Sequence, residues 1–263
     1  MIRALYSAAS GMKADETNVD NIANNLANAN TVGYKMRRAQ FQDLMYQSMV
    51  QPGSAAGQQT VVPTGLQLGL GTRAASNEIV FTQGAFTETS NPLDMVIQGR
   101  GFFQVRQPSG ELAYTRAGQF HTDKDGNIVT SDGNPLEPQM TIPPTALQIS
   151  IATDGTVSYT LPGQTAAQQA GQIQLANFQN PAGLNSIGRS LYTPTDASGD
   201  ATVGTPGGQE GMGSLLQGYV EQSNVSIVDE FINLIQAQRG YEANSKVVQA
   251  ADQMFQQINN LTR

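Results

Sequence analysis

The residue types that most often catalyse reactions or bind metals are few and scattered in this chain. Cysteine is absent, and the single histidine, His121, stands between Phe120 and Thr122 beside a turn signal. A lone histidine supplies neither a catalytic triad nor a metal-binding cluster. Carboxylates are spread over expected loops, with no spacing that pairs an acid with a base. The sequence therefore predicts no catalytic and no metal-binding residues.

Two short motifs resemble binding loops but lack a defining residue. Asp123-Lys124-Asp125-Gly126 begins like a calcium loop, yet its glycine comes too early and position twelve would be Asn134 instead of glutamate. Gly99-Arg100-Gly101 begins like a dinucleotide-binding motif, but Gln104 replaces the third glycine and a strand is expected to follow. We therefore predict a hairpin turn at residues 123–126, no dinucleotide-binding motif at residues 99–101, and no cofactor.

Composition excludes several further classes of protein. Charged residues make up 13% of the 263 residues, about half the usual share, and the net charge is -7. A negative balance argues against nucleic-acid binding. No stretch approaches the ~18–20 apolar residues that span a bilayer, so no direct membrane insertion is predicted. The N-terminal apolar region is interrupted by Ser7, Ser10 and Gly11, so we expect any export to occur without a cleaved signal.

Apolar residues recur every seven positions near the N-terminus and predict a helix within residues 1–30. The series is Leu5, Met12, Val19 and Leu26, with Ala8 and Ile22 between its members. Asn30-Thr31-Val32-Gly33 then supplies a stop signal. A helix of ~25 residues would be ~37 Å long.

A stronger heptad series occupies the C-terminal end. Its members are Val220, Ile227, Leu234, Tyr241, Val248 and Phe255, with Ala237, Ala251 and Ile258 between them and Phe231 beside them. Ser226 is the expected N-cap, with Asp229 three residues later as the acidic partner of a capping box. The pattern predicts a helix of ~35 residues, ~50 Å long, with a left-handed coiled-coil seam that needs a partner.

Neither predicted helix is expected to be stable alone. Burial of about ten apolar side chains provides at most ~15–30 kcal/mol, whereas ordering ~35 residues costs ~1–2 kcal/mol apiece. We therefore expect both ends to be poorly ordered in the free subunit and to fold on assembly. An intramolecular helix pair that caps the β-rich part is the alternative.

Short apolar runs separated by turn signals predict a β-rich body between the two ends. The expected strands lie at residues 81–86, 95–98, 101–105, 112–115 and 128–130, with more within 141–161 and 171–179. Residues 195–214, rich in glycine, are expected to form a connector. Residues 46–76 predict either an exposed loop or a long hairpin built on 60–62 and 66–68.

The predicted fold class is α+β, with paired N- and C-terminal coiled-coil helices and a discontinuous, β-rich central body. Three regions are expected: a helical assembly core of residues 1–35 plus 222–263, a connector region of 36–82 plus 191–221 with an extended loop or hairpin at 46–68, and an outer β domain of 83–190. The charge balance is zero over 1–35 and -1 over 222–263, which leaves -6 for the middle. Near-neutral ends can pack together with little repulsion, and an acidic body keeps the free subunit soluble.

Six segments resemble, in order, the bacterial flagellar basal-body rod and hook family. They are Ala4–Met12, Ala23–Lys35, Asp94–Phe103, Tyr114–Gly118, Ser223–Phe231 and Gln238–Asn244. Their length and common order make chance an inadequate explanation, and together they span most of the chain.

The resemblance implies a non-enzymatic subunit that polymerises with itself into a hollow axial tube, with helices inside and β domains outside. It also implies export, without cleavage, by the flagellar type III export apparatus into the rod that crosses the periplasm. The implied partners are further copies of the chain, the proximal rod and hook-side axial proteins, and the ring bushing proteins around the rod.

Under this resemblance the apolar residues of both helices are expected to form the assembly interface. They are Leu5, Met12, Val19, Ile22 and Leu26 in the first helix, and Ile227, Phe231, Leu234, Tyr241, Val248 and Phe255 in the second. A second group is expected to shape the exit from the first helix: Asn24, Asn25, Asn28, Gly33 and Tyr34.

Residues 46–68 resemble the insertion that distinguishes the distal part of the rod from the flexible hook. The residues singled out there are Tyr46, Pro52, Gly53, Pro63, Gly65 and Leu66, while Ser54–Gln59 depart from the family pattern. This segment and the chain length favour the distal rod, a rigid shaft that transmits torque and lets exported proteins pass; a proximal rod or hook subunit is the alternative. A different class, a secreted β-domain adhesin or glycan-binding module, would use exposed aromatic residues, but tryptophan is absent and aromatics total 6%.

Overall fold

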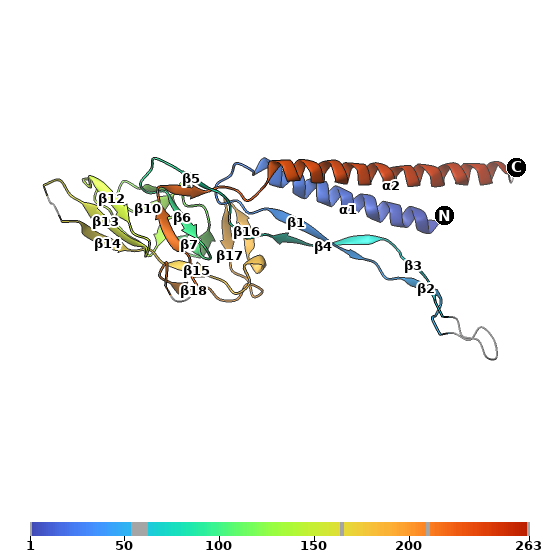
Figure 1. Cartoon of the computed structure of the whole chain (residues 1–263), viewed down its shortest axis with the longest axis horizontal. Helices are drawn as coiled ribbons and strands as arrows, with labels where there is room; N and C mark the ends of the chain where they lie inside the picture. The colour runs from blue at the N-terminus through green and yellow to red at the C-terminus, as the bar shows by residue number, and fades with distance from the viewer. Residues whose placement is uncertain (1, 54–62, 164–165, 209–210, 262–263) are drawn as a thin grey trace. The chain divides into compact units, whose positions relative to one another are not determined.

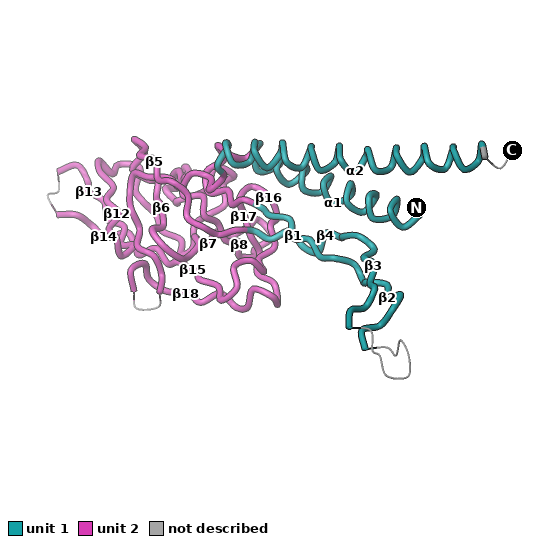
Figure 2. The backbone as a smooth tube through the Cα atoms, turned by 45° about the vertical axis from the view of Figure 1, so that its right-hand side comes forward, with its two compact units in different colours: residues 1–27, 37–79, 226–263 teal, residues 28–36, 80–225 magenta. Residues whose placement is uncertain are grey.

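A computed structural model describes residues 2–53, 63–163, 166–208 and 211–261, with a helix at each end and strands between them (Figure 1). The predicted α+β class, with terminal helices and a β-rich middle, is confirmed. The chain forms two compact units, coloured separately in Figure 2. Unit 1 is residues 1–27, 37–79 and 226–263, and unit 2 is residues 28–36 and 80–225. This division differs from the three expected regions, because most of 36–82 belongs to unit 1 and all of 191–221 to unit 2.

Unit 1 contains the two helices, α1 (Ile2–Ala27, 26 residues) and α2 (Ile227–Leu261, 35 residues), which lie side by side. Both predicted helices are therefore confirmed. The Asp229 N–H donates to Ser226 Oγ at 3.4 Å, which confirms the predicted N-cap. The placement of Val220 in the helical heptad series is wrong, because Val220 lies in strand β20 (Tyr219–Glu221). Since the helix begins only after Ser226, the seven-residue spacing from Val220 to Ile227 has no helical meaning.

The rest of unit 1 is a two-stranded ribbon that packs against α1 at its base. Strand β1 (Arg37–Asp43) pairs antiparallel with β4 (Thr72–Ile79), and β2 (Gln47–Val50) pairs antiparallel with β3 (Leu66–Leu68). Both β1 and β4 contact α1. The segment forms a hairpin, one of the two predicted alternatives, and β3 lies at the expected residues 66–68. Its partner is β2 at residues 47–50, where no strand was expected. The strand expected at 60–62 lies outside the described residues.

Unit 2 is built around a seven-stranded sheet with the order β16-β17-β8-β7-β15-β18, in which β11 also pairs with β7. The strands are β7 (Phe102–Arg106), β8 (Leu112–Thr115), β11 (Leu136–Glu137), β15 (Leu175–Asn177), β16 (Asn185–Gly188), β17 (Leu191–Thr193) and β18 (Thr202–Gly204). A single 3₁₀ turn, η1 (Pro181–Gly183), precedes β16 in the described chain.

Smaller sheets complete unit 2. Strands β12 (Gln148–Ile151), β13 (Thr156–Thr160) and β14 (Gln168–Gln172) form a three-stranded sheet. Two-stranded sheets pair β5 (Phe86–Glu88) with β20, β6 (Met95–Gln98) with β19 (Ser214–Gln217), and β9 (Phe120–Thr122) with β10 (Ile128–Thr130). The core lies between these sheets, where Met95, Phe103, Val105, Phe120 and Leu175 are fully buried. The strands predicted at 95–98, 112–115 and 128–130 are confirmed.

Two predictions for the body are wrong. Residues 81–86 form no strand before Phe86, because their backbone groups bond to side chains: Thr82 O accepts from Lys35 Nζ, and the Gly84 N–H donates to the Glu221 carboxylate. Residues 195–214 are more than a connector, since they contain β18, which pairs with β15 in the main sheet.

Candidate assembly interface

The seam between α1 and α2 is lined by small residues. Ala8 and Ala14 in α1 and Ala237 and Ala251 in α2 are all buried. Small side chains let two helix backbones approach closely, which leaves little room for additional atoms. Such small side chains are compatible with the direct contact between α1 and α2.

Two glycines, Gly11 and Gly240, each lie against a polar side chain of the other helix. A methyl group on Gly11 would lie 2.7 Å from Asn244 Nδ2, and one on Gly240 would lie 3.1 Å from Asp15 Oδ2. Asn244 Nδ2 in turn donates to Asp15 Oδ2 at 3.0 Å, which joins the two helices. Glycine lowers helix propensity, but at these two positions it makes room for a polar bond between the helices.

The predicted interface residues of α1 are largely covered within one chain. Ile22 is buried, and Leu5, Met12, Val19 and Leu26 are half-buried. In α2, Leu234 and Val248 are half-buried, but Ile227, Phe231, Tyr241 and Phe255 are 43%, 48%, 48% and 36% exposed. The single chain thus covers one side of the predicted seam and leaves large apolar side chains on α2 in contact with solvent.

The exposed apolar surface of α2 extends beyond the predicted residues. Six more large apolar side chains of α2 are exposed, in two groups whose members lie three, four or seven positions apart. The first group is Val228, Ile232 and Ile235, and the second is Val247, Met254 and Ile258. Val19 and Tyr241 also line a groove of about 480 Å³ together with Glu16, Asp20 and Glu242. Contiguous exposed apolar surface on a soluble protein marks an interaction site.

The exit from α1 is fastened by Asn25, one of the residues predicted to shape it. Asn25 is 1% exposed, and its Nδ2 donates to Arg37 O at 2.8 Å while its Oδ1 accepts from the Arg37 N–H at 2.9 Å. The amide thereby bonds both backbone groups of Arg37, as a strand neighbour would. Asn25 Nδ2 also lies 3.2 Å from Glu230 Oε2 in the first turns of α2. Asn25 therefore joins α1, β1 and α2.

Gly33, the second fixed point of the predicted exit, belongs to unit 2 and is required by geometry. Its φ is +70°, a backbone conformation that side chains disfavour. A methyl group there would lie 2.7 Å from Ala117 Cα and 2.8 Å from the carbonyl carbon of Arg116. The Gly33 N–H donates to Glu221 O at 2.8 Å. Of the remaining exit residues, Asn24 is exposed, and Asn28 and Tyr34 are half-buried.

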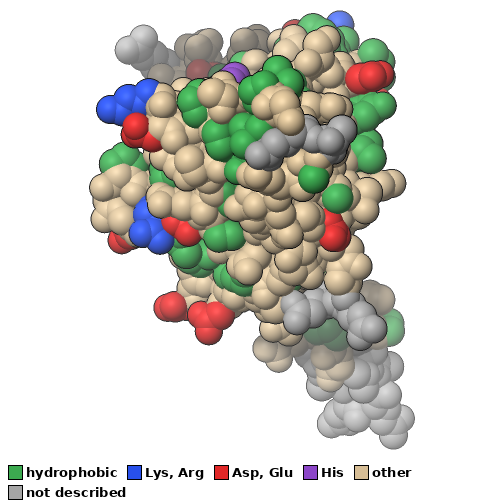
Figure 3. Space-filling model, turned by 90° about the vertical axis from the view of Figure 1, so that its left-hand side faces the viewer, with side chains coloured by type: hydrophobic (Ala, Val, Ile, Leu, Met, Phe, Trp, Pro, Cys, Tyr) green, Lys and Arg blue, Asp and Glu red, His purple; other side chains and the backbone are tan. Residues whose placement is uncertain are grey.

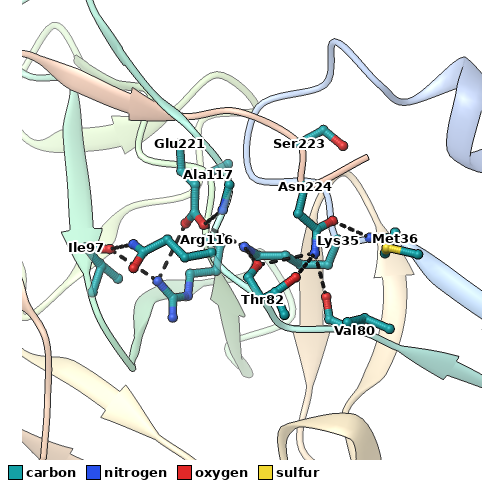
Figure 4. A network of polar contacts seen from close by, with 12 residues as sticks. Lys35, Met36, Val80, Thr82, Ile97, Arg116, Ala117, Glu221, Ser223 and Asn224 are labelled. Atoms are coloured by element: carbon teal, nitrogen blue, oxygen red, sulfur yellow. Dashed lines mark hydrogen bonds and ion pairs between the residues drawn. The ribbon is translucent and has the colours of Figure 1, made fainter. Parts of the chain in front are cut away.

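Beside Gly33 lies a buried charged cluster in unit 2, which we call the Lys35–Glu221 joint (Figure 4). Lys35 Nζ lies 2.6 Å from Glu221 Oε1, and these side chains are 1% and 0% exposed. Arg116 Nη1 lies 3.5 Å from Glu221 Oε2. Burial lowers the pKa of the Lys35 ammonium group, and the adjacent Glu221 carboxylate acts in the opposite direction. Burial lowers the pKa of Arg116 in the same way, again opposed by Glu221.

The two cations of the joint are further stabilised by neutral groups. Lys35 Nζ donates to Thr82 O at 2.8 Å. Arg116 Nη2 donates to Gly99 O at 2.7 Å, and its guanidinium carbon lies 5.4 Å from the centre of the Phe102 ring. Buried charges require such partners, because an isolated ion loses its hydration without compensation. The joint therefore depends on residues from distant parts of unit 2.

Asn224 closes the same region of unit 2. Its Oδ1 accepts from the Met36 N–H at 2.7 Å, and its Nδ2 donates to Val80 O and to Thr82 Oγ1, both at 2.8 Å. The Val80 N–H also donates to Met36 O at 2.9 Å. Asn224 thus holds together three pieces of chain that are far apart in sequence (Figure 4).

The residues of the joint were not singled out from the sequence as site residues. Lys35, Arg116 and Asn224 belong to the segments that carry the family resemblance, and Glu221 lies two residues before the segment that contains Asn224. The available signal was a rare charge beside apolar residues, as in Tyr219-Val220-Glu221, in a chain with 13% charged residues.

The segment predicted to be rod-specific lies at the far part of the ribbon in unit 1. Tyr46 and Leu66 are 55% and 53% exposed, Pro52, Gly53 and Pro63 are exposed, and Gly65 is half-buried. Met45, Met49 and Val50 on the same segment are exposed as well. These apolar side chains have no hydrophobic core of their own.

Charged side chains are sparse on the face of the molecule drawn in Figure 3, where uncharged polar groups and backbone dominate. Within the described ranges, no group of three or more His, Cys, Asp and Glu residues is arranged to hold a metal ion. None of the described helices combines the length and apolar character needed to span a bilayer.

Three protein-family models match separate parts of the chain. The model described as "Flagella basal body rod protein" matches residues 5–35, and "Flagellar hook protein FlgE/F/G D1 domain" matches residues 96–159. A third, "Flagellar basal body rod FlgEFG protein C-terminal", matches residues 216–261. Each match contains part of the joint or of its surroundings: Gly33 and Lys35, then Arg116, then Glu221 and Asn224.

Relatives along the full chain carry the same description. The chain is 51% identical over 261 residues to the flagellar basal-body rod protein FlgG of Caulobacter vibrioides, covering 99% of both chains. It is 44% identical to the FlgG of Borreliella burgdorferi and 40% identical to that of Bacillus subtilis, each covering 100% of both chains. The flagellar hook protein FlgE of Borreliella burgdorferi is 41% identical over 132 residues, which are 49% of this chain and 29% of that protein.

Proposed function

The chain belongs to the flagellar basal-body rod family, and from this membership we propose that it is a structural subunit of the distal rod. Copies of it polymerise into a hollow, rigid shaft that transmits torque from motor to hook and lets exported proteins pass. The observation that carries the proposal is similarity over the whole chain to rod proteins, against a match over 49% of the chain to a hook protein. A proximal rod or hook role is correspondingly less supported.

The exposed apolar face of α2 supports self-assembly through the helices. Each large apolar side chain contributes roughly 1.5–3 kcal/mol when it moves from water into a packed interface. Ile227, Phe231 and Tyr241 are each more than 40% exposed in the single chain, so much of this free energy is still available. Neighbouring helices of the polymer supply the surface that covers these side chains, together with the half-buried Leu234 and Val248.

The ribbon supports a rigid shaft. A two-stranded hairpin is marginally stable in water on its own, and the apolar side chains of Met45, Tyr46 and Leu66 are exposed along this one. Contact with neighbouring copies would cover these side chains and brace adjacent subunits. We propose that residues 46–66 provide this bracing.

The partners, the route and the absence of catalysis follow from the same role. We propose contacts with the proximal rod and hook-side axial proteins at the ends of the polymer and with ring bushing proteins around it. Export by the flagellar type III apparatus without a cleaved signal, and passage of the rod across the periplasm, belong to this proposal. We propose a role without catalysis because the chain belongs to a family of structural rod proteins.

Leu234→Asp tests the proposed assembly face. Leu234 is half-buried on α2, so a carboxylate there would be desolvated in any packed interface, and we expect loss of rod assembly and of motility. Asn233→Asp is the matched control, because it adds the same charge at the exposed neighbouring position. Circular dichroism in the tyrosine region should show that unit 2 is folded in both variants. Straight rods and normal motility with Leu234→Asp would refute the proposed interface.

A further inference from the structure

Unit 2 is made from two separate pieces of the chain. The chain passes between the units at 27/28, 36/37, 79/80 and 225/226, so unit 2 consists of the short segment 28–36 and the long segment 80–225. The short segment comes from near the N-terminus, and the long segment ends only shortly before α2. Unit 2 therefore includes residues from near both ends of the chain.

The Lys35–Glu221 joint is where these pieces meet. Lys35 comes from the short segment, Arg116 from the middle of the long segment, and Glu221 from its last strand. Gly84, near the start of the long segment, donates its N–H to Glu221 Oε1 at 2.9 Å. Asn224 bonds Met36, Val80 and Thr82 in the same region (Figure 4). Start, middle and end of unit 2 all contribute polar groups to one buried cluster.

None of these groups is stable in its place without the others. Glu221 is fully buried. Without Lys35, the Glu221 carboxylate would be left with Arg116, the more distant of its two cations. Removal of Glu221 would leave two buried cations facing each other. Loss of one member of a buried ion pair is strongly destabilising, because the remaining charge is desolvated without compensation.

We propose that the joint is a closure that makes folding of unit 2 conditional on the presence of both of its segments, 28–36 and 80–225. Lys35 and Glu221 are 186 positions apart, so unit 2 cannot complete its fold until almost the whole chain is available. This inference rests on the proposed function for its consequence. A subunit delivered end first through an export apparatus stays incompletely folded, whichever end leads, until delivery is nearly finished.

The alternative is a local reinforcement, in which the sheets of residues 80–217 fold independently of the joint and the joint stabilises only the residues around it. Amide hydrogen exchange of the purified full-length chain separates the two. The Gly33 and Gly84 N–H groups bond directly to Glu221 and report on the joint itself. The Ile142 and Ile173 N–H groups bond to Gly126 O and Gly155 O, both at 2.8 Å, in parts of unit 2 that contribute no residue to the joint.

Glu221→Gln is the decisive variant, with Asp132→Asn as its matched control. Both replace a carboxylate by an amide, but Asp132 pairs with Arg189 at 3.8 Å at the exposed surface of the same unit. If the joint is a closure, Glu221→Gln should accelerate amide hydrogen exchange by a common factor, on the order of 10²–10³-fold. The factor should be the same for the amides of Gly33, Gly84, Ile142 and Ile173. Asp132→Asn should change these rates less than threefold. Acceleration confined to Gly33 and Gly84, or no acceleration, would overturn the proposal.

Asn224→Ala provides a second route if Glu221→Gln is too unstable to purify. It removes the hydrogen bonds to Met36, Val80 and Thr82 without leaving a charge unpaired. We expect a uniform acceleration of roughly tenfold or more at the same four amides, and a purely local effect would again count against closure. These measurements use unassembled protein, whereas Leu234→Asp tests assembly, so either proposal can fail while the other stands.

Discussion

Gly33→Ala is the sharpest test of the geometry at the exit from α1. The residue has a φ of +70°, and a methyl group would lie 2.7 Å from Ala117 Cα and 2.8 Å from the carbonyl carbon of Arg116. Both neighbours are backbone atoms, which cannot move aside by a side-chain rotation. The variant must therefore shift the backbone near the joint or weaken the 2.8 Å bond from the Gly33 N–H to Glu221 O.

The expected loss of stability has two parts. A left-handed backbone conformation costs a residue with a Cβ roughly 1–2 kcal/mol, and overpacking a tight site costs about 1–3 kcal/mol more. Gly133→Ala has only the first part, because Gly133 has a φ of +83° and open space within 4 Å of the added methyl group. The difference between the two variants therefore isolates the cost of overpacking. Both glycines belong to unit 2, and the effect of alanine on the unfolded chain is the same in both. Gly33→Ala should therefore be about 1–3 kcal/mol less stable than Gly133→Ala.

Urea unfolding of the purified chain provides the assay, with near-ultraviolet circular dichroism of tyrosine as the signal for unit 2. The chain has eight tyrosines and no tryptophan, so the signal is distributed over the β-rich part as well as the helices. Equal midpoints and equal slopes for Gly33→Ala and Gly133→Ala would refute the argument from close packing. A lower midpoint for Gly133→Ala than for Gly33→Ala would refute it more strongly.

Three further outcomes are expected. Deletion of residues 46–66 should soften the rod, since it removes the exposed apolar side chains Tyr46 and Leu66 that we propose to brace neighbours, and an unchanged, straight rod in electron micrographs would contradict this. Dilute monomer should gain helical circular dichroism at 222 nm on polymerisation, because the apolar face of α2 is uncovered in one chain; full amide protection along both helices in the monomer would contradict it. Burial raises the pKa of Tyr114 above its usual 10.0, so above that pH the unfolded chain loses its phenolic proton before the folded chain does, and stability should fall as pH rises. Urea titrations between about pH 9 and 11 should show that the free energy of unfolding falls less steeply with pH in Tyr114→Phe than in the unsubstituted chain. The same pH dependence in both proteins would refute the assignment of this loss to Tyr114.

The helices could be predicted because their signals are local and repeated. Five of the six heptad positions assigned to the C-terminal helix lie in α2, and Ser226 caps it as expected. Val220 failed because one apolar residue at the right interval carries no information about where a helix begins. The cap at Ser226, a local hydrogen-bonding signal, was the more reliable guide to that boundary.

Strand predictions succeeded where a run of apolar residues is buried and failed where backbone groups bond to side chains. Residues 95–98 form β6 with three fully buried members. Residues 81–86 also contain two phenylalanines and an alanine, but the Lys35 and Glu221 side chains bond to their backbone in place of a neighbouring strand. These bonds come from side chains 47 and 137 positions away in the sequence, so they leave no local signal.

The joint shows the same limit for site prediction. Asn25 and Gly33 could be selected because they stand in a recognisable segment next to a helix end. The partnership of Lys35 with Glu221 spans 186 positions, and no spacing rule connects them. Only the fold brings them within 2.6 Å.

The two units differ in the chemistry that holds their sequence-distant parts together. In unit 1 the links are mainly neutral amides, such as Asn77 to Asn21 and Asn25 to the backbone of Arg37, and each contributes about 0.5–1.5 kcal/mol. The buried Glu230 beside Asn25 lies in the first turns of α2, where the helix dipole favours a negative charge. In unit 2 the link is a fully buried ion pair, whose disruption costs about 3–5 kcal/mol. Under the proposed assembly, weak links suit helices that repack when neighbouring subunits arrive, and a strong link suits a β-rich unit that is complete before the polymer bears torque.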